Sequence, residues 1–273
     1  MPVETLIHPT AIIYSGAKID PTATIKPYAV IGENVQIGAG TVIGSHAVID
    51  GHTTIGENCK IYAGASIGLD PQDLSYKNEP TGVIMGDRVT VREYATIHRG
   101  TGDRFTTIGD DCFFMNYSHI AHDCRIGKGV ILANGATFAG HCQVGDYSVI
   151  AGTTAFHQHV RVGRMVMVSG VSGTRVDVPP FAMCDGRPLE MRGLNLVGMK
   201  RQKFAPPLRT AIKQAYTLLY RSGQEKAKVY EQIEAEYGQI PEVMEILQFF
   251  KTSKRGVCKG FTGIVSDGAE PEE

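Results

Sequence analysis

The sequence predicts an all-β parallel β-helix, a hexapeptide-repeat solenoid, followed by a small C-terminal α-helical unit. An isoleucine occurs at every sixth position from Ile7 to Ile67, and a second run of large apolar residues keeps this spacing from Ile108 to Val168. A small or β-branched residue stands two positions before each of them. No helix and no ordinary strand has a period of six, so the pattern indicates a repeat architecture.

The shape of one coil follows from these spacings. Alternate residues of a strand face the same side, so the large residue and the small residue two positions earlier both point inward. A glycine often follows the isoleucine, as at Gly32, Gly38 and Gly44, and allows a sharp bend before the next flat segment. Three such segments close a triangular coil of about 18 residues, and successive coils stack at roughly 4.8 Å.

Two polar, turn-rich insertions interrupt the repeat, at residues 69–82 and 99–107. Loops that leave a solenoid commonly carry its binding residues. The repeat ends near Pro179 and Pro180, because consecutive prolines cannot continue a hydrogen-bonded ladder. We therefore expect residues 1–186 to form the β-helix with its two inserted loops.

The period changes to a helical one from Pro207 onward. Apolar spacing predicts one helix that stops at Ser222 and Gly223, a second around residues 227–237, and a third that Pro241 opens. Residues 187–263 thus form a linker and a helical unit, which is too small to be stable alone. Residues 264–273 are acidic and poor in apolar side chains, and we expect a disordered tail there.

Composition excludes several classes of protein. The net charge of −1 does not indicate a nucleic-acid-binding protein, which is usually strongly basic. No apolar run reaches 18 residues, so we expect no membrane span, and the first residues lack a signal region. We therefore expect a cytoplasmic protein. Four of the six cysteines occupy the small inward position of the repeat, which indicates buried, reduced thiols: Cys59, Cys112, Cys124 and Cys142.

Histidines fall into two groups. Those at outward or corner positions are expected to be solvated surface residues: His8, His46, His52 and His98. The second group clusters, because positions near 122, 140 and 158 lie above one another when a coil has about 18 residues. His122, His141 and the pair His157-Gln158 fall within two positions of that stack. Three successive coils are therefore predicted to place proton-handling groups along one edge.

The centre of this edge has the composition of an acid–base site. His122 is followed by Asp123, and a histidine beside a carboxylate is typical of a general base with an orienting partner. Gly140 precedes His141 one coil later, where its N–H is free to approach a carbonyl closely and to stabilise an oxyanion. These residues alone leave open whether His119 or His122 is the base.

Several segments resemble the UDP-N-acetylglucosamine O-acyltransferases that begin lipid A synthesis. They are residues 72–74, 97–100, 116–124, 131–134, 177–180 and 220–223, and the likeness covers essentially residues 7–256. The resemblance implies a left-handed β-helix that forms a homotrimer with active sites between subunits. It also implies transfer of a 3-hydroxyacyl chain from acyl carrier protein to the glucosamine 3-hydroxyl of UDP-N-acetylglucosamine, with the carrier thioester as donor and no cofactor or metal.

The resemblance also implies a role for each matching residue. His122 would deprotonate the sugar hydroxyl, Asp123 would support it, and the N–H of Gly140 would stabilise the oxyanion. His141 would contact the N-acetyl region, and Asp73 would reach the sugar from a neighbouring subunit. The nucleotide-sugar would be held by His157, Gln158, Asn195 and Arg201. Gly170 would leave the acyl groove open for a long chain.

Some positions depart from the family pattern. Ser75 stands where a lysine is usual, with Lys77 two positions later, and Gln202 stands where a second arginine is common. These departures leave the donor chain length and the exact acceptor open. The acidic carrier protein would be steered by basic residues near the last coils, for which the candidates are Arg161, Arg164, Lys200, Arg201, Lys203, Lys213 and Arg221.

Other functions remain as alternatives. An acyltransferase acting on a 3-amino UDP-sugar would share most of this pattern. One that acylates a glucosamine amine later in the pathway would carry an additional N-terminal domain, whereas the repeat here begins at Ile7. A small acetyltransferase using acetyl-CoA would not need the helical end. A zinc enzyme of the carbonic-anhydrase type needs three converging histidines, and a pure scaffold would not need the stacked histidines.

Overall fold

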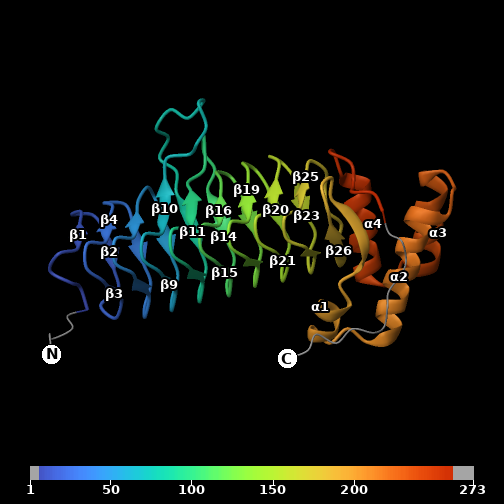
Figure 1. Cartoon of the computed structure of the whole chain (residues 1–273), viewed down its shortest axis with the longest axis horizontal. Helices are drawn as coiled ribbons and strands as arrows, with labels where there is room; N and C mark the ends of the chain where they lie inside the picture. The colour runs from blue at the N-terminus through green and yellow to red at the C-terminus, as the bar shows by residue number, and fades with distance from the viewer. Residues whose placement is uncertain (1–5, 261–273) are drawn as a thin grey trace.

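The computed structural model describes residues 6–260 and shows a straight solenoid of stacked coils with helices at its C-terminal end (Figure 1). Three parallel sheets form the three faces of the prism. The predicted fold class is therefore confirmed. Within the described residues, no helix is long and apolar enough to cross a membrane. The predicted tail at 264–273 lies outside the described part of the chain.

The nine-stranded and eight-stranded sheets are the faces that meet at the histidine edge. The nine-stranded sheet contains, in spatial order, β1 (Ile12–Ile13), β4 (Val30–Ile31), β7 (Val48–Ile49), β10 (Ser66–Leu69), β13 (Thr96–His98), β16 (His119–Ile120), β19 (Thr137–Phe138), β22 (Ala155–Phe156) and β25 (Gly173–Thr174). The eight-stranded sheet contains β2 (Lys18–Ile19), β5 (Gln36–Ile37), β8 (Thr54–Ile55), β11 (Val83–Met85), β14 (Thr106–Ile108), β17 (Arg125–Ile126), β20 (Gln143–Val144) and β23 (Arg161–Val162).

The ten-stranded sheet forms the third face and carries the end of the solenoid. In chain order it contains β3 (Thr24–Ile25), β6 (Val42–Ile43), β9 (Lys60–Ile61), β12 (Thr90–Val91), β15 (Phe113–Phe114), β18 (Ile131–Leu132), β21 (Val149–Ile150), β24 (Met167–Val168), β26 (Ala182–Asp185) and β27 (Glu190–Leu194). The ladder resumes after the two prolines, since β26 pairs in parallel with β24. β27 then turns back and pairs with β26 in the antiparallel direction.

Register keeps each isoleucine above the one before it. Ile13 pairs with Ile31, and Ile31 with Ile49. Both insertions leave the prism at a corner, after which the register resumes, since Ile67 pairs with Ile97 and Ile97 with Ile120. The first insertion stands out from the prism as a long loop beyond β10 (Figure 1). The insertions therefore add side chains to one edge without disturbing the core.

The core is a single column of inward side chains, as the repeat predicts. Ile31, Ile49 and Ile67 are completely buried, and burial of each such side chain stabilises the fold by about 1.5–3 kcal/mol. Aromatic residues take over in later coils, where the rings of Phe138 and Phe156 stack at 4.3 Å. A buried hydroxyl at a small inward position bonds to the next coil, as Ser148 Oγ does to the carbonyl oxygen of Gly163 at 2.9 Å.

All six cysteines are buried and unbridged, which confirms the prediction for the four in the repeat. The thiols of the four repeat cysteines replace a small apolar side chain and donate to a carbonyl of the following coil. Cys142 Sγ, for example, lies 3.2 Å from the carbonyl oxygen of His157. Burial raises the pKa of Cys112 to about 12, so this thiol remains protonated and inert.

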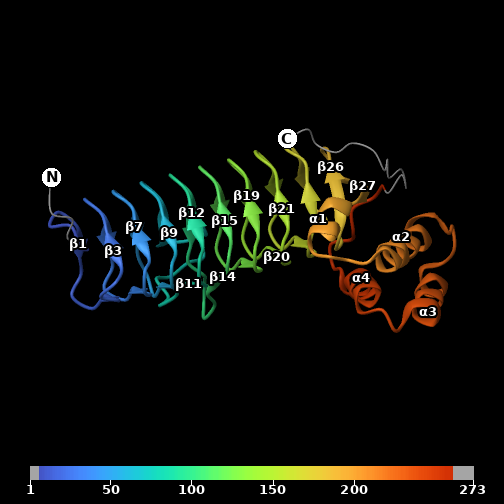
Figure 2. The same ribbon diagram turned by 90° about the horizontal axis from the view of Figure 1, so that it is seen from below.

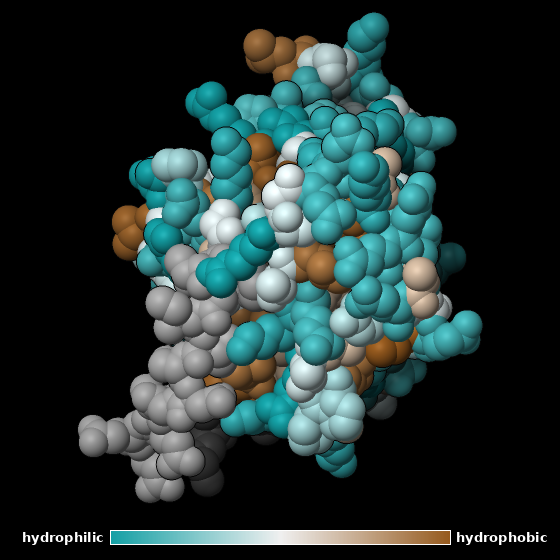
Figure 3. Space-filling view, turned by 90° about the vertical axis from the view of Figure 1, so that its right-hand side faces the viewer, coloured by the Kyte–Doolittle hydropathy of each residue, from teal (hydrophilic) through white to brown (hydrophobic). Residues whose placement is uncertain are grey.

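The C-terminal unit contains α1 (Leu196–Arg201), α2 (Pro206–Arg221), α3 (Lys226–Tyr237) and α4 (Pro241–Thr252). The last three match the predicted helices. The first is too short for a visible period, and its N-cap is Asn195, whose side chain accepts a hydrogen bond from the N–H of Gly198. Figure 2 shows α2, α3 and α4 grouped beside the end of the prism. From that end the surface is mostly hydrophilic, with small separate groups of hydrophobic residues (Figure 3).

Two arginines of the last coils hold this unit in place. Arg164 Nε lies 2.6 Å from a carboxylate oxygen of Glu245 on α4. Arg161 donates to the carbonyl oxygen of Phe249 at 3.0 Å and lies over its ring. Both arginines are thus bonded within the chain, which disfavours our expectation that they steer an acidic partner.

Candidate active site

The histidine edge is the corner between the nine-stranded and eight-stranded sheets. Asp123, His141 and His159 take the same place in three successive turns, each with a left-handed φ, of 61°, 62° and 64°. The turns are hydrogen-bonded in a column, since His141 N donates to the carbonyl oxygen of His122 and His159 N to that of Gly140, both at 2.9 Å. The three side chains therefore lie one above another.

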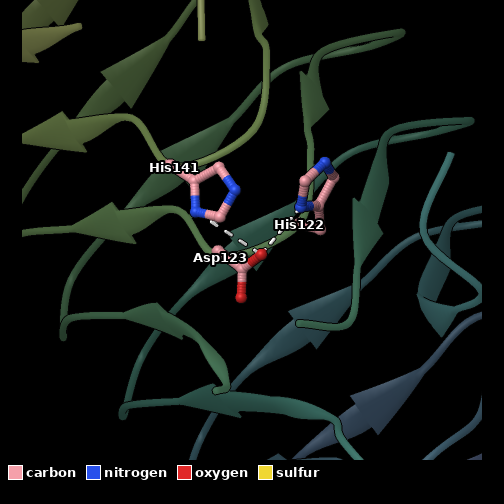
Figure 4. Close-up of side chains that lie close together, drawn as sticks. All are labelled: His122, Asp123 and His141. Carbon is pink, nitrogen blue, oxygen red and sulfur yellow. Dashed lines mark hydrogen bonds and ion pairs between the residues drawn. The ribbon is translucent and has the colours of Figure 1, made fainter. Parts of the chain in front are cut away.

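The centre of the site is a contact among His122, Asp123 and His141 (Figure 4). Nδ1 of His122 donates to Oδ2 of Asp123 at 2.8 Å, and Nδ1 of His141 lies 3.6 Å from the same oxygen. The two imidazole rings meet edge to face at 5.1 Å. His141 also stacks on His159, with ring centroids 4.4 Å apart. The predicted pairing of His122 with Asp123 is thus present.

Asp123 is held as a buried anion. Its side chain is only 1% exposed, and burial alone would raise its pKa. Hydrogen bonds from His122, and from the N–H and hydroxyl of Thr101 at 3.0 and 2.7 Å, outweigh burial and lower the pKa to about 2. A carboxylate in this state can orient His122 and stabilise the imidazolium that forms when Nε2 accepts a proton.

Gly140 lies directly against the reactive nitrogen of His122. A Cβ at this position would be 2.5 Å from Nε2 and from Cε1 of His122, so only glycine fits beside the ring in this position. The N–H of Gly140 has no acceptor among the described residues. It is therefore free to donate to an oxygen of a ligand. The next residue, His141, has a pKa that is lowered by burial, and the negative charge of Asp123 opposes this effect only in part.

The first insertion brings Asp73 to the site. Oδ2 of Asp73 lies 3.9 Å from Nε2 of His122 in the same chain, whereas we expected Asp73 to come from a neighbouring subunit. Its other oxygen, Oδ1, accepts hydrogen bonds from the N–H and the hydroxyl of Ser75, each at 2.8 Å. These bonds lower the pKa of Asp73. Ser75 therefore has a structural role in this loop.

Other predicted residues lie away from this centre. His157 and Gln158 are exposed in the next turn of the same edge, beside His159. Asn195 donates to the carbonyl oxygen of Met165, and Arg201 is exposed at the end of α1. Gly170 is exposed in the turn between β24 and β25, at a different corner of the prism from His122. One chain does not bring Asn195, Arg201 and Gly170 to His122.

Three residues that lie at or near this edge were not assigned to it from the sequence. Thr101 lies in the second insertion, where the six-residue repeat is interrupted and does not predict the position of a residue. The only sequence feature that places His159 at this edge is its spacing of one coil from His141. His98 was expected at the surface but is buried, with 8% exposure, because β10 and β13 are lengthened at the insertions and pair Leu69 with His98. Burial lowers the pKa of His98 to about 4, and its ring meets that of His119 at 5.0 Å.

His122, Asp123 and His141 are also a possible set of metal ligands, since their donor atoms lie within 4.8 Å of one another. The observed bonds do not suit a zinc ion. Both oxygens of Asp123 already accept hydrogen bonds from Thr101, and Oδ2 also accepts one from His122. His119 bonds Thr96 at 2.7 Å and does not join this group. The arrangement therefore favours a hydrogen-bonded acid–base pair.

Comparison with known proteins agrees with this geometry. Residues 177–258 match the family model of UDP-N-acetylglucosamine O-acyltransferase, domain 2. Three segments, 16–51, 34–69 and 105–140, match the bacterial transferase hexapeptide model.

Relatives match over nearly their whole length. The acyl-[acyl-carrier-protein]–UDP-N-acetylglucosamine O-acyltransferase of Thermodesulfovibrio yellowstonii is 48% identical over 93% of this chain and 99% of its own. That of Syntrophobacter fumaroxidans is 43% identical with the same coverage. The structure of the Moraxella catarrhalis UDP-N-acetylglucosamine O-acyltransferase superposes with a TM-score of 0.90 at 39% identity, over 93% of this chain and all of that one.

Proposed function

The chain belongs to the UDP-N-acetylglucosamine O-acyltransferase family, and on that premise we propose the reaction it catalyses. It transfers a 3-hydroxyacyl chain from acyl carrier protein to the glucosamine 3-hydroxyl of UDP-N-acetylglucosamine, the first step of lipid A biosynthesis. The observation that carries the proposal is the hydrogen bond of 2.8 Å between His122 and the buried carboxylate of Asp123. It directs Nδ1–H toward Asp123 and leaves the lone pair of Nε2 for a substrate hydroxyl.

His122 acts as the general base. Its Nε2 takes the proton of the sugar 3-hydroxyl as that oxygen attacks the thioester carbonyl carbon. Asp123 remains ionised and stabilises the imidazolium that results. The tetrahedral intermediate then collapses, the C–S bond breaks, and the imidazolium returns its proton to the departing thiolate. The products are the 3-O-acyl sugar nucleotide and the free carrier thiol.

Gly140 and His141 complete the chemical centre. Gly140 lies against the His122 ring, and its N–H has no acceptor among the described residues, so we assign to this N–H the stabilisation of the oxyanion. His141 contacts the N-acetyl region of the sugar one coil along. Asp73, 3.9 Å from His122 Nε2, contacts the sugar on the side of the inserted loop.

The remaining site residues act across a subunit interface. Gly170, Asn195 and Arg201 lie away from His122 in one chain, which supports sites shared between the members of a homotrimer. Arg201 and Asn195 then hold the nucleotide with His157 and Gln158 of the next chain, and Gly170 leaves room for a long acyl chain. A mass in solution of three times 29.5 kDa is expected.

No cofactor takes part in this reaction, because the thioester already supplies an activated acyl group. Dialysis against a chelator should leave the rate unchanged. Acyl carrier protein and the sugar nucleotide are the two partners. Both are soluble, and we place the enzyme in the cytoplasm.

The test is acyl transfer from a set of 3-hydroxyacyl carrier proteins to UDP-N-acetylglucosamine, with wild type beside His122→Ala and the exposed control His52→Ala. We expect loss of about 10³–10⁴-fold in kcat for His122→Ala, the scale for removal of a catalytic base, and little change for the control. If wild type is inactive with every donor, the 3-amino UDP-sugar is the next acceptor to test. A His122→Ala variant that retains wild-type kcat would refute the assignment of the base.

A further inference from the structure

The segment after α4 returns from the helical unit to the histidine edge. It is fixed there by Asp177, which is 1% exposed. The N–H of Asp177 donates to the carbonyl oxygen of Gly256 at 2.8 Å, and its carbonyl oxygen accepts from Cys258 N at 2.9 Å. Its carboxylate accepts from the hydroxyl of Ser253 at 2.8 Å. Arg255 lies between these anchored residues.

Arg255 is placed against His157 by this anchoring. Its Nε donates to the carbonyl oxygen of Arg175 at 2.7 Å, which fixes the plane of the guanidinium. One of its terminal nitrogens then lies 3.2 Å from Nδ1 of His157. A guanidinium has only donors, so Nδ1 of a neutral His157 must accept in this contact. The ring proton is then on Nε2.

Nδ1 of His157 has two neighbours, Arg255 and Gln158, and each favours a different tautomer of the ring. Nδ1 of His157 also lies 3.3 Å from the carbonyl oxygen of Gln158, which can only accept. If Nδ1 carried the proton it would donate to Gln158 and would face the donors of Arg255 with a hydrogen. The Nε2–H tautomer satisfies the contact with Arg255, whereas the Nδ1–H tautomer satisfies the contact with Gln158.

The tautomer of His157 determines whether its exposed Nε2 offers a ligand a hydrogen or a lone pair. Arg255, though not His157 itself, lines a hollow of about 540 Å³, whose other walls include His141, His159, Lys254 and Asp177. His157 is exposed, and its Nε2 has no hydrogen-bond partner among the described residues. An Nε2–H group is a donor for a phosphate or carbonyl oxygen, whereas an Nε2 lone pair would repel it.

We propose that Arg255 is a positioning residue that selects the Nε2–H tautomer of His157, so that His157 donates a hydrogen bond to an anionic oxygen of the sugar nucleotide. The identity of that ligand rests on the proposed function. The tautomer itself does not, because both contacts lie within the protein. The helical unit thus contributes to the substrate site through the segment that follows α4.

The test has a spectroscopic and a kinetic part. Histidine-selective ¹⁵N labelling and two-bond ¹H–¹⁵N spectra, at about pH 8 where an ordinary histidine is neutral, report which nitrogen carries the proton. A His157→Gln spectrum identifies the signal. We expect Nε2–H in wild type and in Arg255→Lys, which keeps a donor, and Nδ1–H in Arg255→Met. The KM for UDP-N-acetylglucosamine should rise about ten-fold in Arg255→Met, the value of one charge-assisted hydrogen bond, with kcat almost unchanged.

Lys254→Met is the matched control, because it removes one positive charge from the same hollow without a contact to His157. It should leave the tautomer unchanged. A wild-type His157 protonated on Nδ1 overturns the proposal without any variant, and so does an unchanged tautomer in Arg255→Met. Absence of transfer with every donor would refute the proposed function and leave the tautomer result standing.

Discussion

The hydroxyl of Thr101 lies 2.7 Å from Oδ2 of Asp123, the same oxygen that accepts a hydrogen bond from His122. The second insertion thus reaches back to the carboxylate that orients the candidate base. Because Thr101 also donates its N–H to Oδ1, the carboxylate is fixed on both oxygens. The loop therefore acts on the direction of His122 through Asp123.

Thr101→Val should lower kcat about ten-fold while the protein stays folded. Valine keeps the shape and the backbone N–H but removes the hydroxyl donor, a charge-assisted hydrogen bond worth about 1.5–3 kcal/mol. Thr101→Ser, which keeps the hydroxyl, is the control and should retain most activity. The measurement is the steady-state kcat of both variants. Equal kcat values for Thr101→Val and Thr101→Ser would show that the hydroxyl of Thr101 has no role in catalysis.

Gly140→Ala should lower the activity strongly, and the loss should appear in kcat. The new Cβ would be 2.5 Å from the ring of His122, so the imidazole must move away from the position beside the Gly140 N–H. A loss of about 10²-fold or more is expected, the scale for one oxyanion donor. Gly152→Ala, whose Cβ meets only one carbonyl oxygen at 3.1 Å, is the control. Comparable losses in the two variants would contradict the proposed role.

Ser75→Ala should raise the KM for the sugar nucleotide about three- to ten-fold, because Asp73 loses one of the two hydrogen bonds that orient it, worth about 1 kcal/mol. The measurement is a substrate titration of wild type, Ser75→Ala and Lys77→Ala. We expect Lys77→Ala to raise this KM less than Ser75→Ala does. The reverse order would mean that Lys77 has taken over the contact made by the lysine usual in the family.

Buried His98 should make the fold sensitive to mild acid. Its pKa is about 4 in the folded chain, against about 6.5 when unfolded. Between these values the unfolded state binds more protons, so the free energy of unfolding falls as the pH drops from 6.5 to 4, by about 3 kcal/mol in total. Asp123, with its lowered pKa of about 2, adds a separate loss as the pH falls from 4 to 2.

Urea unfolding followed by circular dichroism, at one protein concentration and at pH 7 and 4.5, measures this loss for His98. His98→Gln should lose less stability between the two pH values than wild type. The exposed His52→Gln should lose as much as wild type. If all three proteins lose the same amount, His98 is not the source of the acid sensitivity.

The parts of the fold that repeat could be predicted from the sequence. Period six located the inward isoleucines, and the length of a coil placed His122, His141 and His157 on one edge. That edge was correct, although the column that stacks is Asp123, His141 and His159. The difference arises because side-chain direction depends on the left-handed turn, which a spacing does not reveal. Handedness and residue roles came from the family resemblance alone.

What could not be predicted lies where the repeat is broken. Thr101 and Asp73 reach the site through loops whose paths depend on contacts such as that between Arg99 Nε and the hydroxyl of Tyr76, at 2.9 Å. His98 is buried because two strands lengthen at the same point. Arg255 arrives from a segment almost 100 residues away in sequence from its partner His157.

The antiparallel strand β27 has a consequence for how the molecule behaves in concentrated solution. An unfinished parallel coil would expose a row of N–H and C=O groups in register to accept the first coil of another molecule, and such growth has no natural stop. Because β27 reverses direction, and Met191 within it pairs with Gly260 of the returning segment, the ten-stranded face ends in an antiparallel strand within the described residues and not in a parallel edge in register with another first coil. On this face, a second molecule cannot add its first coil in register, so end-to-end growth of the solenoid is disfavoured there.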